Sequence, residues 1–466
     1  LDLTKLFQEV QILFMKNDDL KENIMGTMPV GRLLVKISLP MMISMLVQAL
    51  YNIVDSIFVA KLSTDALTAV SLAFPIQNLM ISASVGTGVG LNALLSMRLG
   101  QKNEKAVTAS ALNGIFLFTI TCVIFMILGF FIPEFYLKSQ TSDAHIVSLG
   151  VDYLKICMIV SFGLFGSILF ERLLQATGLT MLSMVSQITG AVVNTILDPI
   201  LIFGLLGCPK MGIAGAAWAT VIGQIAATVV AFALNIKRNK DIKFSAKGFR
   251  PNLIIIRDIY KVGVPSILLG SLGSVLTYLI NLILGAFSTV AIAVYGVYFK
   301  LQSFVFMPVF GLNNGIVPIV AYNYGAKYKD RIIKSIKLCA FVALAIMIVG
   351  MLIFIFFPVQ LLGMFSPNEE MLRIGVPALR IIAIHFPLAA IGITFTSVFQ
   401  AFGRGLLSMF ASFTRQLIGL LPAAWLLSLT GNVNNIWWAF PIAEVISLIA
   451  CIIAMKNVYK TQIKTL

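Results

Sequence analysis

Residues 106–131 read AVTASALNGIFLFTITCVIFMILGFF, a run without a single charged side chain. A helix that crosses a bilayer needs about 20 mostly apolar residues, so this stretch predicts a transmembrane helix. Comparable apolar runs occupy residues 33–59, 69–97, 147–177, 179–203 and 213–236, and then 258–284, 291–322, 333–357, 372–402, 405–429 and 435–455. The sequence therefore predicts an all-α polytopic membrane protein with twelve transmembrane helices.

The composition of the 466-residue chain leads to the same class of protein. It is 59% hydrophobic and 11% charged, with a mean hydropathy of +0.96. Soluble domains carry about 25% charged residues, so a soluble protein is excluded. No cleavable signal peptide is expected. Residues 1–14, before Met15, are interpreted as an upstream extension or an expression remnant and are left out of the fold prediction.

The basic residues set the orientation. The formal net charge is +15, and most of the 34 Lys and Arg fall in alternate loops, with a dense cluster between Lys237 and Lys261. Cytoplasmic loops of membrane proteins are enriched in Lys and Arg. We therefore expect both termini in the cytoplasm and the protein in the plasma (inner) membrane. Anionic lipid headgroups are the expected partner of these charges, nucleic acid is not, and we expect a monomer.

The two halves of the chain repeat each other. Arg32, Lys36 and Pro40 recur as Arg257, Lys261 and Pro265, and further matches fall at the same spacing: Gln77 with Gln302, Gly86 with Gly311, Gly90 with Gly315, Gly100 with Gly325, and Gln175 with Gln400. Six spans per half give a parallel repeat. The expected division is a cytoplasmic segment 1–30, an N-lobe 31–236, a basic linker 237–257, a C-lobe 258–456 and a cytoplasmic C-terminus 457–466.

A parallel repeat of this kind can alternate access to a central site by rocking one bundle against the other. Pro40 and Pro265 lie in the first helix of each bundle, where a proline removes a backbone hydrogen bond and permits a bend. Each is interpreted either as a hinge or as a static kink that improves packing.

Two acids at membrane depth are the main candidates for function. Asp55 and Asp198 lie near the outer ends of the first and fifth helices. A charge at a helix centre costs about 2.5–3.5 kcal/mol on insertion scales, so such residues are rarely incidental. Helical spacing and depth bring further oxygen-bearing or amide side chains to the same level: Gln48, Tyr51, Asn52, Asn194 and Thr220. This group either binds Na⁺ or shares a proton, or else the acids pair with a basic residue such as Lys155.

Other ionisable residues are more ambiguous. Glu171, beside Arg172, is interpreted either as a second acid on a cytoplasmic path or as half of an interfacial ion pair. In the second half, Ile280 and Ala423 stand where the repeat would place the two acids, so ion coupling is expected in the first half alone. The second half carries instead Arg380, His385 and Glu444, of which Glu444 is expected to pair with Arg415.

Several functions are excluded by what the sequence lacks. It contains no Walker-type phosphate loop, so no ATP-driven pump is expected, and its two histidines, His145 and His385, cannot assemble a metal or nucleophilic centre. We therefore expect neither an enzyme nor a cofactor. The five cysteines have no metal-ligand spacing and are expected to be structural: Cys122, Cys157, Cys208, Cys339 and Cys451.

Several motifs resemble those of the multidrug and toxic compound extrusion (MATE) transporters, in particular the small bacterial multidrug exporters. They are Pro40-Met41-Met42, the string QALYNIVD ending at Asp55, Gly86-x3-Gly90 with Leu99-Gly100, Gln175-Ala176-x-Gly178 and Asn194-x3-Asp198-Pro199. The resemblance implies a V-shaped pair of six-helix lobes that exchanges organic cations and amphipathic drugs for H⁺ or Na⁺. It assigns the ion site to Asp55, Asn194, Asp198 and Thr220. One branch also uses carboxylates in helices 7 and 10, which this chain lacks, with Asn281 and Arg380 there instead.

Two transport functions remain as alternatives. A multidrug exporter would line its substrate path with adaptable apolar residues, and the candidates are Tyr298, Phe304, Phe306 and Met307. A lipid-linked saccharide flippase of related architecture would instead need several Arg or Lys to hold a diphosphate. The basic residues within the spans are scattered and the acid pair would repel an anion, so the exporter is favoured.

Overall fold

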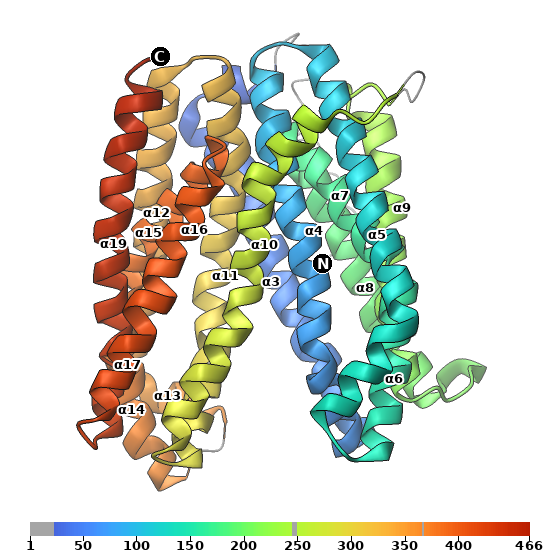
Figure 1. Cartoon of the computed structure of the whole chain (residues 1–466), viewed down its shortest axis with the longest axis vertical. Helices are drawn as coiled ribbons and strands as arrows, with labels where there is room; N and C mark the ends of the chain where they lie inside the picture. The colour runs from blue at the N-terminus through green and yellow to red at the C-terminus, as the bar shows by residue number, and fades with distance from the viewer. Residues whose placement is uncertain (1–22, 245–248, 366–367) are drawn as a thin grey trace, which may run out of the picture.

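The computed structural model describes residues 23–244, 249–365 and 368–466, and these residues form a bundle of long helices (Figure 1). The predicted extension 1–14 lies outside the described residues. The helices of the first half are α2 (Ile24–Thr27), α3 (Val30–Leu62), α4 (Thr64–Gly100), α5 (Glu104–Gln140), α6 (Ala144–Ile159), α7 (Phe162–Ala176), α8 (Thr180–Phe203), η1 (Leu205–Gly207) and α9 (Ile213–Arg238).

The second half follows the same order after a connection that carries the basic cluster. Its helices are α10 (Leu253–Gly285), α11 (Thr289–Gly325), α12 (Lys329–Phe356), α13 (Pro358–Gly363), α14 (Glu369–Ala383), α15 (Phe386–Ala401), α16 (Gly405–Phe413), η2 (Thr414–Leu420), α17 (Leu421–Ser428), α18 (Val433–Ile436), α19 (Ala439–Val458) and η3 (Tyr459–Ile463).

Every predicted span falls on one helix or on consecutive helical segments. Ten spans in the described residues are long and apolar enough to cross a membrane, and two bent pairs bring the number to 12. The bent pairs are α6 with α7, at 45°, and α14 with α15, at 49°. They occupy corresponding places in the two halves. The predicted all-α fold with twelve spans is confirmed.

The duplication extends to the turns that begin and end the helices. Ser63 caps α4 and Ser288 caps α11, each accepting a hydrogen bond from the backbone N–H three residues later, at 3.0 and 3.1 Å. Gly178 and Gly403 follow α7 and α15 with φ of +85° and +70°, a backbone conformation that glycine adopts without strain. Each pair has the same spacing as the repeat in the sequence.

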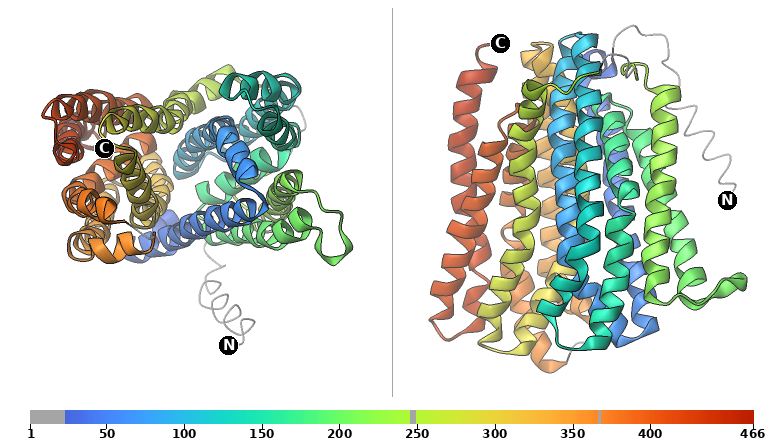
Figure 2. Two further views of the ribbon diagram at one scale, coloured as in Figure 1. Left: turned by 90° about the horizontal axis from the view of Figure 1, so that it is seen from below. Right: turned by 45° about the vertical axis from the view of Figure 1, so that its right-hand side comes forward.

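Two apolar cores hold the bundle, and the first helix of each half contributes to both. One core is built mainly from residues of the first half and the other mainly from the second, and the two groups of helices lie side by side (Figure 2). Leu33 and Ile37, at the start of α3, nevertheless belong to the second-half core. Ile255 and Ile259, at the start of α10, belong to the first-half core. Each first helix therefore crosses from one half to the other.

Glycines allow the halves to touch at the predicted cytoplasmic end. A Cβ on Gly100 would lie 2.0 Å from the carbonyl oxygen of Tyr322, and a Cβ on Gly325 would lie 2.0 Å from that of Met97. Met97 and Tyr322 are themselves repeat partners, so the contact is reciprocal about a pseudo-twofold axis. Small residues let helix backbones approach closely in membrane proteins, and here they join the two halves.

A short segment straps the same end. Residues 23–28, which include α2 and are called the strap below, are bonded to both halves. The side-chain amide of Asn23 donates to the Thr177 carbonyl of the first half at 3.0 Å and to the Asp241 carboxylate of the connection between the halves at 2.8 Å. Arg331 of α12 donates to the carbonyl oxygens of Met25 and Met28 at 2.9 and 2.8 Å. Separating the halves at this end would break at least one of these two sets of bonds.

Candidate functional site

The structure brings the two acids of the first half together. Asp55 lies on the C-terminal half of α3 and Asp198 on α8, and the two helices pack against each other. Asp198 is fully buried at 0% exposure, Asp55 is half-buried, and the two carboxylates interact electrostatically. Like charges so close in a medium of low dielectric repel strongly unless a cation or a proton lies with them.

Helix α9 completes the group. The amide nitrogen of Asn194 donates to the hydroxyl of Thr220 at 3.3 Å, and the Tyr51 hydroxyl is hydrogen-bonded to the same threonine. Gly223 explains how α9 comes this close, because a Cβ there would lie 2.9 Å from the Cβ of Asn194. The structure thus places Thr220 beside Asn194 and Tyr51.

The oxygens of this group are short of partners. Asp55 Oδ1, Asn194 Oδ1 and both carboxylate oxygens of Asp198 are buried, and no described residue forms a hydrogen bond with them. Buried polar atoms in native proteins are nearly always satisfied, so each exception requires an explanation. Convergent carboxylate and amide oxygens are the donors that a hard cation prefers, and a carboxylate pair can also share a proton.

Three neighbours of the acids were not predicted from the sequence. Tyr153 of α6 is buried within electrostatic range of Asp55, and so is Cys157 one turn further along the helix. Gln77 of α4 holds both, donating to the Tyr153 hydroxyl at 3.1 Å and to the Cys157 sulfur at 3.6 Å. The sequence shows Gln77 as one of the residues that recur in the repeat, but gives no indication that α4 and α6 face the acids.

Comparison with known proteins identifies the family. The sequence model described as MatE matches residues 40–200 and again residues 265–425. The chain belongs to the MatE family. The two matches begin at Pro40 and Pro265, so the family model finds the same repeat that the glycines and prolines indicate, and the predicted resemblance is confirmed.

Relatives of this MatE protein align along nearly its full length. Multidrug export protein MepA of Staphylococcus aureus (strain MSSA476) is 27% identical over 430 residues, covering 91% of this chain and 93% of the relative. A solved structure described as the outward-facing conformation of a multidrug resistance MATE family transporter of the MOP superfamily superposes with a TM-score of 0.88 at 23% identity, covering 96% and 100%. A MATE in the bent conformation superposes at 0.84 with 24% identity, covering 93% and 97%.

Two further candidates of the first half, Gln48 and Glu171, form no hydrogen bond with the acid group in the described residues. Gln48 is half-buried on α3, and no hydrogen bond to the acid group is found for it among the described residues. Glu171 is buried on α7, where Ser186 donates to it at 3.4 Å. Ser186 is twelve positions before Asp198 on α8, which is about 18 Å along a helix. The alternative partner of the acids, Lys155, interacts electrostatically with Glu134.

The substrate-path candidates of this MatE protein occupy different environments. Tyr298 and Phe306 are buried, at 1% and 5% exposure, in an aromatic cluster of the second half. Phe304 is 43% exposed, and Met307 is half-buried. The first pair therefore packs the core, and only Phe304 and Met307 offer accessible surface.

The hinge candidates and the second-half charges can also be placed. Pro40 and Pro265 lie inside α3 and α10, which run on as single helices. The expected pairing of Glu444 with Arg415 is confirmed, with 4.0 Å between a carboxylate oxygen and a guanidinium nitrogen. His385 bonds the Ile382 carbonyl through its ring nitrogen, as an interior histidine does.

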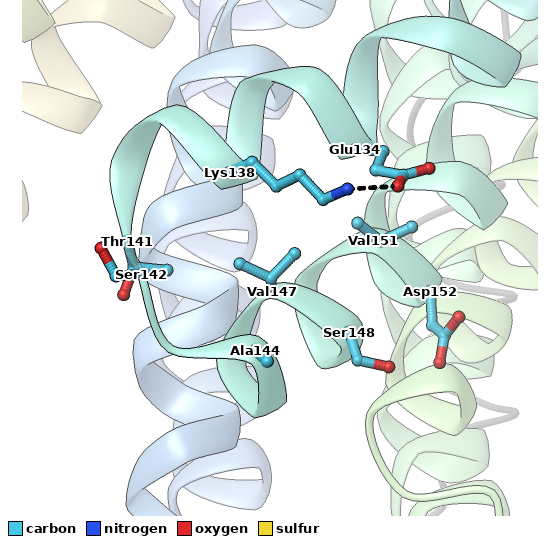
Figure 3. A pocket seen from close by; sticks show the side chains of 9 residues that line it. All are labelled: Glu134, Lys138, Thr141, Ser142, Ala144, Val147, Ser148, Val151 and Asp152. Atoms are coloured by element: carbon cyan, nitrogen blue, oxygen red, sulfur yellow. Dashed lines mark hydrogen bonds and ion pairs between the residues drawn. The ribbon is translucent and has the colours of Figure 1, made fainter.

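A surface pocket of about 460 Å³ lies elsewhere, at the turn between α5 and α6 (Figure 3). Its lining includes Glu134 and Lys138, paired at 2.7 Å, and Asp152. The two paired side chains are 56% and 65% exposed, so solvent screens them. This pocket contains none of the residues of the acid group.

Proposed function

We propose that this MATE protein is a secondary active multidrug exporter that exchanges H⁺ or Na⁺ for amphipathic organic cations by alternating access. The observation that carries the proposal is the group around Asp55 and Asp198, in which three of the four carboxylate oxygens are buried without hydrogen-bond partners among the described residues. Apart from the coupling ion, the proposal includes no cofactor. The names of the relatives, multidrug export protein and multidrug resistance transporter, support the same class of substrate.

The acid group suits an exchangeable cation. With both carboxylates charged and no cation bound, their repulsion would push α3 and α8 apart. A bound Na⁺ or a shared proton removes that repulsion and lets the helices close. The site therefore has one geometry with the ion bound and another without it. Two such states are required if ion binding is to be coupled to drug transport.

The geometry of α3 links this site to the contact between the halves. The start of α3 belongs to the second-half core through Leu33 and Ile37. Its C-terminal half carries Asp55, which interacts with Asp198. A change of the C-terminal half of α3 on cation binding would be transmitted to α11 of the other half, because Gly311 and Gly315 pack against Met42 and Ser38 of α3. The proposed moving bodies are the lobes 31–236 and 258–456, with Pro40 and Pro265 as proposed hinges and both termini in the cytoplasm.

The drug is expected to contact accessible apolar surface of α11. Phe304 and Met307 are the exposed and half-buried candidates there, and methionine adapts to ligands of varied shape. We also propose that anionic lipid headgroups bind the basic loops and that the protein is a monomer. A flippase for lipid-linked saccharides is not favoured, because two buried carboxylates oppose a diphosphate.

Export by purified protein in vesicles tests the function. Ethidium movement is measured under an imposed pH gradient and, separately, an imposed Na⁺ gradient. We expect one gradient to drive export by the wild type and by Asp152→Asn, an exposed acid of the same half. We expect Asp198→Asn to lose gradient-driven export. Wild-type rates from Asp198→Asn would remove the coupling assignment, and a wild type that responds to neither gradient would remove the exporter.

A further inference from the structure

One carboxylate is buried in the second half, far along the chain from the acid group. Glu444 of α19 is 3% exposed. Its Oε1 has no hydrogen-bond partner among the described residues, and its Oε2 lies 4.0 Å from Nη1 of Arg415. Hydrogen bonds between guanidinium and carboxylate groups are about 2.7–2.9 Å long. The pair is therefore held by charge alone, and half of the carboxylate is unsatisfied.

The partner of Glu444 sits in an unusual piece of helix. Arg415 belongs to η2, a π-helical stretch in the middle of the span that contains α16 and α17. Its side chain is 30% exposed, against 4% for Glu444, so part of the arginine side chain lies at the surface of the protein while the carboxylate does not. π-helical turns are rare, and those that occur are often located at functional sites. The partly exposed Arg415 side chain therefore has space to move away from Glu444.

Glycines make room for the carboxylate on both sides. A Cβ on Gly392 of α15 would lie 3.3 Å from Glu444 Oε1. A Cβ on Gly419 of η2 would lie 2.8 Å from the Cα of Ala443, so the π-helix packs directly on the turn of α19 that carries Glu444. The carboxylate is thus enclosed between three helices.

The groups that surround Glu444 favour a proton over a metal ion or a drug. The titratable residues in electrostatic contact with it or with Arg415 are Tyr298 of α11, His385 at the start of α15, and Cys451 of α19 itself. The rings of Tyr298 and His385 pack on Phe440, with centroids at 5.8 and 6.1 Å. Na⁺ would need several oxygen ligands, which this aromatic setting does not supply. A proton needs neither ligands nor space.

We propose that Glu444 is a second proton-binding group of the transport cycle. In one state its carboxylate is charged and paired with Arg415. In the other it has taken one proton from water, is neutral, and has released the guanidinium to the protein edge. This rests on the proposed function of ion-coupled export, and it adds a proton in the half of the molecule that lacks counterparts of Asp55 and Asp198.

The proton count tests the assignment. Reconstituted wild type, Glu444→Gln, Glu444→Asp and the exposed control Glu134→Gln are compared for H⁺ moved per ethidium exported, over a series of pH values. We expect Glu444→Gln to stay folded and bind ethidium, but to move about one proton fewer per drug and to lose part of the pH dependence of export. Glu444→Asp should restore both in part. A wild-type ratio and pH profile from Glu444→Gln would reduce the ion pair to a structural role.

Arg415 provides a second test that leaves the acid in place. Removing its positive charge favours the protonated form of Glu444, so Arg415→Gln should shift the pH profile of export to higher pH. An unshifted profile overturns the proposal even if Glu444→Gln fails to fold. Asp198→Asn separates the two levels of inference, because it should abolish coupled export whatever Glu444 does. Wild type that exchanges Na⁺ without moving H⁺ overturns the role of Glu444 and leaves the exporter intact.

Discussion

Tyr51 contributes a hydroxyl where the acid group meets α9. It is hydrogen-bonded to Thr220 and interacts electrostatically with Asp55 and Asp198. We expect Tyr51→Phe to keep the ring packing but lose this bond, so that the cation binds less tightly and export needs a steeper ion gradient. Ethidium export measured against gradient size checks this. Tyr278→Phe, on the 64% exposed Tyr278, is the control and should leave the curve unchanged.

At the level of single residues, sequence reasoning found those whose chemistry is unusual for a membrane. Asp55 and Asp198 stand out because charge is costly in lipid, and the structure brings them together with Asn194, Thr220 and Tyr51. Tyr153 and Gln77 were missed because a buried tyrosine or glutamine is ordinary in any helix. Their importance depends on which helices face one another, and helical periodicity alone does not determine that.

Among the helices, α8 and α9 depend on two glycines facing each other. A Cβ on Gly223 would lie 2.7 Å from the carbonyl oxygen of Gly190. We expect Gly223→Ala to separate the helices and destabilise the protein by about 1–3 kcal/mol, the usual cost of overpacking. Gly273→Ala is the control, since a Cβ there meets nothing within 4 Å. A thermal unfolding series in detergent should show a lower midpoint for Gly223→Ala only; equal midpoints would contradict the packing argument.

The strap gives the fold a dependence on pH. Asp241 lies outside the spans, and burial raises its pKa more than the hydrogen bond from Asn23 lowers it. The folded protein therefore holds this proton more tightly than an unfolded chain does. The contribution of Asp241 to stability is largest at low pH and is lost as pH rises through the raised pKa. We expect the thermal unfolding midpoint of the wild type, relative to that of Asp241→Asn, to fall as the pH rises through the raised pKa of Asp241. A constant difference would show that Asp241 does not titrate differently on folding.

The helices themselves were predictable, whereas the way they cross was not. Span length and hydropathy are properties of contiguous residues, so every predicted run fell on a helix, including the two bent pairs α6–α7 and α14–α15. The start of α3 lies in the second-half core and the start of α10 in the first. The apolar face of a helix has the same sequence pattern whichever half it packs against. The sequence therefore could not predict that α3 and α10 each start in the core of the other half.

For the whole molecule, the pseudo-twofold contact sets how far the predicted cytoplasmic end can close. We expect Gly100→Ala to hold the halves apart there, because its Cβ would strike the Tyr322 carbonyl oxygen, which is backbone and cannot turn away. Labelling of cysteines introduced at this end should become faster than in wild type. Gly296→Ala, where a Cβ meets nothing within 4 Å, is the control. Unchanged labelling of Gly100→Ala would mean that the contact does not limit closure.

The crossing of α3 and α10 also bears on biosynthesis. When the first half has been made and inserted, Leu33 and Ile37 still lack the core they finally join, and the first-half core still lacks Ile255 and Ile259. Each half is completed by a helix from the other, so neither is a finished folding unit while the chain is being translated. Until the second half is inserted, the first half exposes an apolar face to lipid. This exposure costs far less free energy in a bilayer than it would in water.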